Sequence, residues 1–126
     1  MSKHLGLVAE MRFELAATLH GLTVSRPSGD NSPYDFIVDT GKDLLKVQVK
    51  SSGYSQSPGS ISFNLGQGAS GKHLYKKLEV HYFALYMSVS DIFFLIPYSL
   101  LAKRLTVKLT VDGKFSRFKE NWNLKA

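Results

Sequence analysis

Three residues suited to phosphate chemistry, Asp35, Gln48 and Lys50, lie on two neighbouring apolar stretches of the sequence. The stretches 34–39 and 45–50 are rich in apolar and β-branched side chains, and a short turn-forming run separates them. We therefore predict a hairpin of two antiparallel strands. Because alternate residues of a strand share a face, Gln48 and Lys50 should point the same way, and the hairpin should return the chain so that Asp35 lies near both.

These polar groups suit a metal-assisted attack on a phosphodiester. A hard divalent cation prefers oxygen ligands, which the Asp35 carboxylate, the Gln48 side-chain oxygen and a nearby strand carbonyl, assigned to Val49, would supply. Protonated Lys50 would instead hold or help deprotonate the attacking water and offset charge on the phosphate. An ordinary amphipathic hairpin with a solvated polar face is the competing interpretation of these residues alone.

The composition is that of a folded, basic protein. Its 126 residues are 44% hydrophobic and 12% aromatic, which favours a globule and a single domain over residues 1–126. Sixteen Lys and Arg residues against ten Asp and Glu residues give a net charge of +6, which favours an anionic partner such as nucleic acid. The chain has no Cys, and its four His residues have no zinc-site spacing, so a zinc centre is not expected.

The first twenty residues carry several charges, so neither a signal peptide nor a membrane-spanning helix is expected. We expect a cytoplasmic protein with no membrane partner.

Apolar periodicity predicts the elements that would position the polar groups. Helical spacing from Leu5 to His20 predicts a first helix, with Glu10 and Glu14 stacked on one side of it. The hydroxyl-rich run 51–59 and the glycine-rich run 66–71 are predicted to be loops that contact phosphate or DNA. The other predicted elements are strands at 22–26, 60–65, 82–87, 92–97 and 105–111, a short helix at 98–104, and an amphipathic terminal helix carrying Phe115, Phe118 and Trp122.

Taken together, Glu10 in the first helix, Asp35 and the Gln48-Val49-Lys50 run resemble the PD-(D/E)XK nuclease superfamily in order and spacing. The helix glutamate is similar to that of archaeal Holliday junction resolvases. The sequence between the first helix and the hairpin is similar to the branch that contains a group I intron homing endonuclease. Further matching pieces are Gly6-x-x-Ala9, Val24-Ser25-x-Pro27-x-Gly29-Asp30-Asn31-x-x-Tyr34, Tyr82 to Tyr86, Leu95-Ile96-Pro97 and Phe118-x-x-x-Trp122.

This resemblance implies an α/β, restriction-endonuclease-like fold: a central mixed β-sheet with the first helix on one face and the later helix on the other. It implies that Asp35 is the bridging ligand of Mg²⁺, for which Mn²⁺ should substitute. Glu10 would be an outer or second ligand, and Lys50 would position the nucleophilic water. Gln48 departs from the usual Asp or Glu of the superfamily, although the homing endonuclease branch carries Gln.

The implied activity is that of a metal-dependent endonuclease that hydrolyses phosphodiesters in duplex or branched DNA, either homing-type or junction-resolvase-type, acting as a homodimer or higher homo-oligomer. A catalytically inactive, nuclease-fold DNA-binding protein is the alternative, because the Gln48 amide brings no negative charge to a metal. The residues that we expect to contact DNA around the site are Arg12, Arg26, Ser51, Ser52, Lys72, Lys76 and Lys77.

Overall fold

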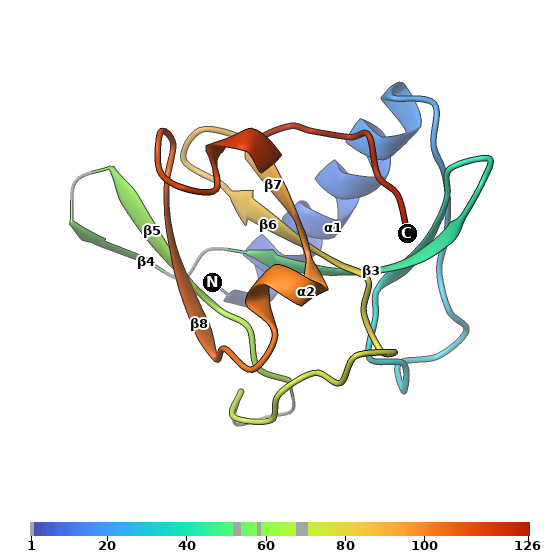
Figure 1. Cartoon of the computed structure of the whole chain (residues 1–126), viewed down its shortest axis with the longest axis horizontal. Coiled ribbons are helices and arrows are strands. Elements are labelled where there is room, and N and C mark those ends of the chain that lie inside the picture. The colour runs from blue at the N-terminus through green and yellow to red at the C-terminus, as the bar shows by residue number, and fades with distance from the viewer. Residues whose placement is uncertain (1, 52–53, 58, 68–70) are drawn as a thin grey trace.

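A five-stranded mixed sheet lies at the centre of the fold in the computed structural model, which describes residues 2–51, 54–57, 59–67 and 71–126 (Figure 1). Its strand order is β1-β2-β3-β6-β7, in which β3 and β6 run parallel and the other neighbouring pairs run antiparallel. The strands are β1 (Thr23–Ser25), β2 (Phe36–Asp39), β3 (Leu44–Ser51), β6 (Tyr82–Met87) and β7 (Ile92–Pro97). The predicted β2–β3 hairpin is confirmed, and the predicted strands 82–87 and 92–97 are β6 and β7, which pair as a second hairpin.

Helix α1 (Ser2–Leu19) covers one face of this sheet. Ala9, Phe13 and Ala17, spaced four apart, are fully buried against the sheet and give the helix its inner face. Gly21 follows the helix with a φ of 81°, a conformation that glycine adopts readily, and so ends it. No described helix is both long and apolar enough to cross a membrane.

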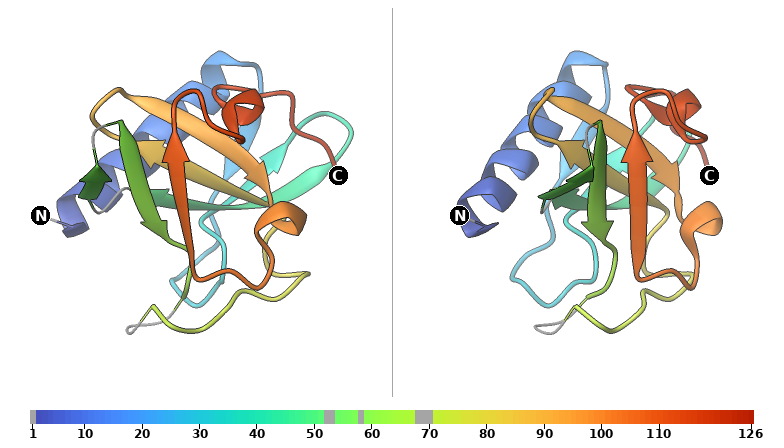
Figure 2. Two further views of the ribbon diagram at one scale, coloured as in Figure 1. Left: turned by 60° about the vertical axis from the view of Figure 1, so that its left-hand side comes forward. Right: turned by 90° about the vertical axis from the view of Figure 1, so that its left-hand side faces the viewer.

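A second, three-stranded sheet covers the other face (Figure 2). It consists of β4 (Tyr54–Ser57), β5 (Ser60–Asn64) and β8 (Thr106–Thr110), and its buried side chains join those of the central sheet in one cluster. Strands β6 and β7 separate the two cores, since consecutive residues of these strands, such as Ala84 and Leu85, belong to different clusters. The later helix, α2 (Tyr98–Leu101), also lies on this face and adds Leu101 to the cluster, but it is a single short turn, so the second sheet provides most of the cover.

The run 51–59 also differs from the predicted loop. Strand β3 continues through Ser51, and residues 54–57 form β4, which pairs with β5 through Tyr54 opposite Ser62 and Ser57 opposite Ser60. The β4 sequence has no run of apolar or β-branched residues that favours a strand by itself, so this strand depends on its backbone pairing with β5.

The predicted terminal helix is wrong. Only a short 3₁₀ turn, η1 (Ser116–Phe118), forms, and Glu120 has a φ of 51°, which is incompatible with a continuing helix. The apolar residues of this segment pack in different cores. Phe115 joins the cluster under the second sheet, whereas Trp122 packs on Phe13 of α1 with ring centroids 5.5 Å apart. A single helical face could not reach both.

Candidate functional site

Asp35 lies directly before β2 and is fixed to the adjacent strand by two hydrogen bonds. Its backbone N–H donates to the Val47 carbonyl at 2.9 Å, and its Oδ2 accepts a hydrogen bond from the Val49 N–H at 2.8 Å. The hairpin thus holds the carboxylate beside the second half of β3, as the sequence predicts.

Gln48 and Lys50 lie on the face of β3 opposite to the buried Val47 and Val49, which pack in the core with α1. The Gln48 Nε2 donates a long hydrogen bond of 3.4 Å to the carbonyl of Val49. The Lys50 Nζ donates to the carbonyl of Gly66 at 2.8 Å. Both side chains are therefore held next to backbone oxygens at the end of β3.

Glu10 approaches the same place from α1. It lines a cavity of about 440 Å³ together with Gln48, Val49 and Lys50. A second cavity of about 470 Å³ is lined by Asp35, Gln48 and Lys50, and a third of about 310 Å³ by Glu10 and Asp35. These three cavities share lining residues, so the structure brings all four predicted catalytic side chains to one group of adjoining cavities.

Burial shapes the charges of this site. Desolvation raises the pKa of Asp35 to about 6. The Val49 N–H lowers that pKa, the nearby Glu10 carboxylate raises it further, and Lys50 and Arg26 lower it. Desolvation also lowers the pKa of Lys50, although Asp35 opposes this. Since the Lys50 Nζ is directed to Gly66, no described ion pair neutralises Asp35.

The donor set fits a hard divalent cation. Asp35 has one carboxylate oxygen without a hydrogen bond among the described residues, and burial beside Glu10 disfavours its negative charge, which a cation would relieve. The Asp35 and Glu10 carboxylates, the Gln48 amide and the Val49 carbonyl are oxygen ligands of the kind that Mg²⁺ binds. No group of three or more acidic or His residues that could hold a metal occurs among the described residues, so the set has only two carboxylates.

Arg26, just after β1, contacts acidic residues of α1. Its guanidinium donates to Glu10 at 3.1 Å and to Glu14 at 3.2 Å, and it lies 4.6 Å from the centroid of the Phe36 ring. Burial alone would lower the pKa of Arg26, but the bonds to both carboxylates raise it. The role of Arg26 in contacting DNA stays a prediction, and the structure assigns its guanidinium these protein partners.

The other predicted DNA-contacting residues are spread more widely. Ser51 lines the 440 Å³ cavity, whereas Ser52 lies outside the described residues. Arg12 forms an exposed ion pair with Asp91, 3.6 Å long, and lines none of the three site cavities. The structure therefore keeps Ser51 at the site and does not bring Arg12 to it.

The three predicted lysine contacts, Lys72, Lys76 and Lys77, are all exposed. Lys76 follows Tyr75, whose ring lines the 470 Å³ cavity, and its backbone N–H donates to Glu79. Lys77 instead lines a separate cavity of about 580 Å³. None of the three lines the cavities of the candidate site, so their contact with DNA stays a prediction.

Sequence reasoning missed two residues of the site, Gly66 and Tyr75. Gly66 accepts the hydrogen bond of Lys50, and a Cβ at this position would collide with the carbonyl of Gly71. Buried Tyr75 places its ring 5.2 Å from the Lys50 Nζ, and burial raises the pKa of its hydroxyl. The signal for Gly66 was the glycine-rich run itself, which marks a close backbone approach.

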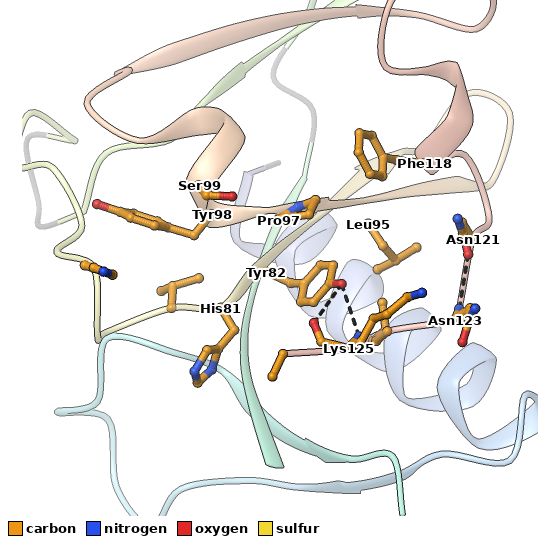
Figure 3. A pocket seen from close by; sticks show the side chains of 14 residues that line it. His81, Tyr82, Leu95, Pro97, Tyr98, Ser99, Phe118, Asn121, Asn123 and Lys125 are labelled. Atoms are coloured by element: carbon orange, nitrogen blue, oxygen red, sulfur yellow. Dashed lines mark hydrogen bonds between the residues drawn. The ribbon is translucent and has the colours of Figure 1, made fainter. Parts of the chain in front are cut away.

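The largest described cavity, about 580 Å³, lies elsewhere (Figure 3). It is mainly apolar, and no Asp or Glu side chain lines it. The Tyr82 hydroxyl inside it donates to the carbonyl of Lys125 at 3.1 Å and accepts from the N–H of Lys125 at 3.2 Å, which ties down the end of the chain. Its lining therefore offers no carboxylate ligand for a cation.

A helix-covered mixed sheet with an acid before one strand and a Gln-x-Lys run on the next defines a restriction-endonuclease-like nuclease fold. The family model described as PD-(D/E)XK endonuclease matches residues 1–124, and the chain belongs to this family. Among solved structures, the chain is similar to the bacterial homing endonuclease I-Ssp6803I, with a TM-score of 0.80 and 23% identity over 97% of this chain and 88% of that one. No curated protein matches the chain significantly.

The family membership supports an endonuclease whose substrate is DNA, in a family whose members generally use divalent metals. The structural likeness, at this level of identity, shows the shared fold.

Proposed function

We propose that this protein is a Mg²⁺-dependent endodeoxyribonuclease that hydrolyses phosphodiester bonds, with Mn²⁺ as a substitute ion. The observation that carries the proposal is the convergence of Glu10, Asp35, Gln48 and Lys50 on three adjoining cavities with shared lining residues. An ordinary amphipathic hairpin would not bring two carboxylates, an amide and an ammonium from three separate segments to the same group of cavities.

Each side chain has a separate role in this proposal. Asp35, Glu10, the Gln48 amide and the Val49 carbonyl would hold the cation, which supplies Lewis acidity toward the scissile phosphate when bound. Lys50 would hold the attacking water, and its lowered pKa makes proton transfer to and from its amine easier near neutral pH. The Gly66 carbonyl, 2.8 Å from the Nζ, sets the position of the amine.

A homing-type substrate, a defined duplex sequence, is favoured by the likeness to a structure named as a homing endonuclease. A junction-resolvase-type substrate is the competing choice within the same chemistry. A panel of supercoiled, linear and four-way-junction DNA would separate the two: preferential resolution of the junction would overturn the homing-type assignment.

We also propose that the protein acts as a homodimer, because one site must otherwise act on both strands in turn. An exposed apolar ridge on α1 supports this. Leu7, Met11, Leu15 and Leu19 are 53%, 60%, 52% and 76% exposed. Residues spaced four apart form a ridge that can interdigitate with the same ridge of a second, antiparallel copy. Burying both ridges would contribute roughly 6–12 kcal/mol before the entropic cost of association, enough for a weak dimer.

A second function, a nuclease-fold DNA-binding protein without activity, is favoured by one observation. Gln48 is neutral, and its Nε2 is directed at the Val49 carbonyl, another predicted ligand. In that case DNA binding should be steeply salt-dependent, unaffected by Asp35→Ala, and accompanied by no Mn²⁺ binding.

The deciding experiment compares nicking of supercoiled DNA by the native chain, Asp35→Ala and Lys50→Ala, with Mg²⁺ or Mn²⁺. We expect cleavage by the native chain only, with both variants still binding DNA. A pure native preparation that cuts nothing, or variants that cut equally well, would contradict the endonuclease proposal.

A further inference from the structure

Arg26 lies between two carboxylates that are one turn apart on α1. Its Nη1 contacts Glu10 Oε1 at 3.1 Å, and its Nη2 contacts Glu14 Oε1 at 3.2 Å. The guanidinium carbon also lies 4.6 Å from the centroid of the Phe36 ring, a cation–π contact that favours this position of the side chain. The guanidinium thus forms an ion pair with both carboxylates and not with one alone.

The two carboxylates differ in their surroundings. Glu10 lines one cavity with Asp35 and another with Gln48 and Lys50, so its charge acts on the candidate metal site. Glu14 lines none of the three cavities of that site. One partner of Arg26 therefore belongs to the site, and the other lies just outside it.

A divalent cation and Arg26 compete for Glu10, because both are positively charged and both need the same oxygen atoms. The electrostatic influence of Arg26 on Asp35 shows that the guanidinium already acts on the acids of the site. When a cation binds, Arg26 is repelled and must release Glu10 at least in part. Among the described residues, Glu14 is the other carboxylate within ion-pair distance that can retain it.

We propose that Glu14 is a positioning residue that keeps Arg26 away from Glu10 when a divalent cation is bound. This inference rests on the proposed metal-dependent function. Without Glu14, Arg26 would pair with Glu10 alone and would compete more strongly with the cation. The expected effect on cation affinity is about three-fold, the size of one exposed ion pair.

The test is a double-mutant cycle on the binding of Mn²⁺ to the full chain without DNA, measured by isothermal titration calorimetry. Glu14→Gln keeps the shape of the side chain, and Arg26→Met keeps an apolar contact on Phe36 while it removes the charge. We expect Glu14→Gln to weaken Mn²⁺ binding about three-fold and Arg26→Met to strengthen it by a similar factor. In the double variant, the effect of Glu14→Gln should largely disappear.

The cycle separates retention of Arg26 by Glu14 from the simple loss of a nearby negative charge. The loss of charge alone would weaken Mn²⁺ binding equally with and without Arg26. An equal effect of Glu14→Gln in both backgrounds would overturn the role of Glu14, as would weaker binding by Arg26→Met. Thermal melts without metal identify any variant that fails to fold, and Arg26→Gln would then replace Arg26→Met. A native chain that binds no Mn²⁺ would instead contradict the proposed function on which this inference rests.

Discussion

Asp35 is a residue whose ionised form costs folding free energy unless a cation is present. Desolvation raises the pKa of its carboxyl from about 3.8 to about 6, so the folded state holds this proton more tightly than the unfolded state does. The stability that the protonated form contributes is complete below the unfolded pKa and is lost as the pH rises through about 6. Such a cost is typical of a site arranged for binding rather than for stability.

We therefore predict that Asp35→Asn stabilises the metal-free protein at pH 7.5 by about 1–3 kcal/mol, because the amide has no charge to desolvate. The Asn side-chain oxygen can still accept the Val49 hydrogen bond. Urea denaturation of both proteins at pH 4 and pH 7.5 measures the difference. A gain of the same size at both pH values would contradict the role of ionisation.

The same pKa sets the acid limit of the proposed activity. Asp35 must be ionised to bind the cation, so protons and the metal ion compete for its carboxylate. At subsaturating Mg²⁺, cleavage should fall about ten-fold per pH unit below pH 6. Raising Mg²⁺ should move this limit to lower pH. Cleavage rates measured from pH 4.5 to 8 at two Mg²⁺ concentrations test the prediction, and a limit that does not move with metal would exclude Asp35 as its origin.

At the scale of the elements, the site depends on how a glycine-rich segment meets β3. Lys50 is held by the carbonyl of Gly66, and that backbone approaches Gly71 too closely for a side chain. Gly6 of α1 provides a contrast, because a Cβ there would meet nothing within 4 Å.

Gly66→Ala should therefore destabilise the fold by about 1–3 kcal/mol and displace the backbone oxygen that positions Lys50. Gly6→Ala is the matched control, and a helix interior should gain about 0.5–1 kcal/mol from it. Thermal denaturation gives both values, and cleavage assays of Gly66→Ala report the position of Lys50. An unchanged melting temperature for Gly66→Ala would show that the segment adapts without cost.

The elements that were predictable from sequence are those whose pattern is local. The β2–β3 hairpin follows from two apolar runs and a turn, and it alone brings Asp35 next to Gln48 and Lys50. Glu10 was predicted as a site residue only from the family resemblance, because no local sequence pattern shows which side of α1 faces the end of a strand. Strand β4 and the irregular path to Trp122 were missed, since one depends on pairing with β5 and the other on contact with Phe13.

At the scale of the whole molecule, the net charge of +6 suits a DNA substrate but opposes self-association. The repulsion between two copies is small at the outer side of α1. Its exposed charged residues near the apolar ridge, such as Arg12 and Glu14, are of both signs, and Leu7, Met11, Leu15 and Leu19 provide an uncharged surface. A second copy of the same helix matches both the spacing and the charge balance of this surface.

Leu15→Glu should therefore abolish the dimer, because an antiparallel pair would bury two new carboxylates against apolar side chains. The matched control is Leu78→Glu, which adds the same charge at a side chain that is 75% exposed and belongs to the turn before β6 rather than to α1. Sedimentation velocity over a range of protein concentrations measures the dimer. We expect the native chain and Leu78→Glu to associate at micromolar concentration and Leu15→Glu to remain monomeric.

If Leu15→Glu still associated, the dimer would have to form through another surface. If the native chain stayed monomeric, one protomer would have to cut each strand separately, and nicked DNA would accumulate before linear product.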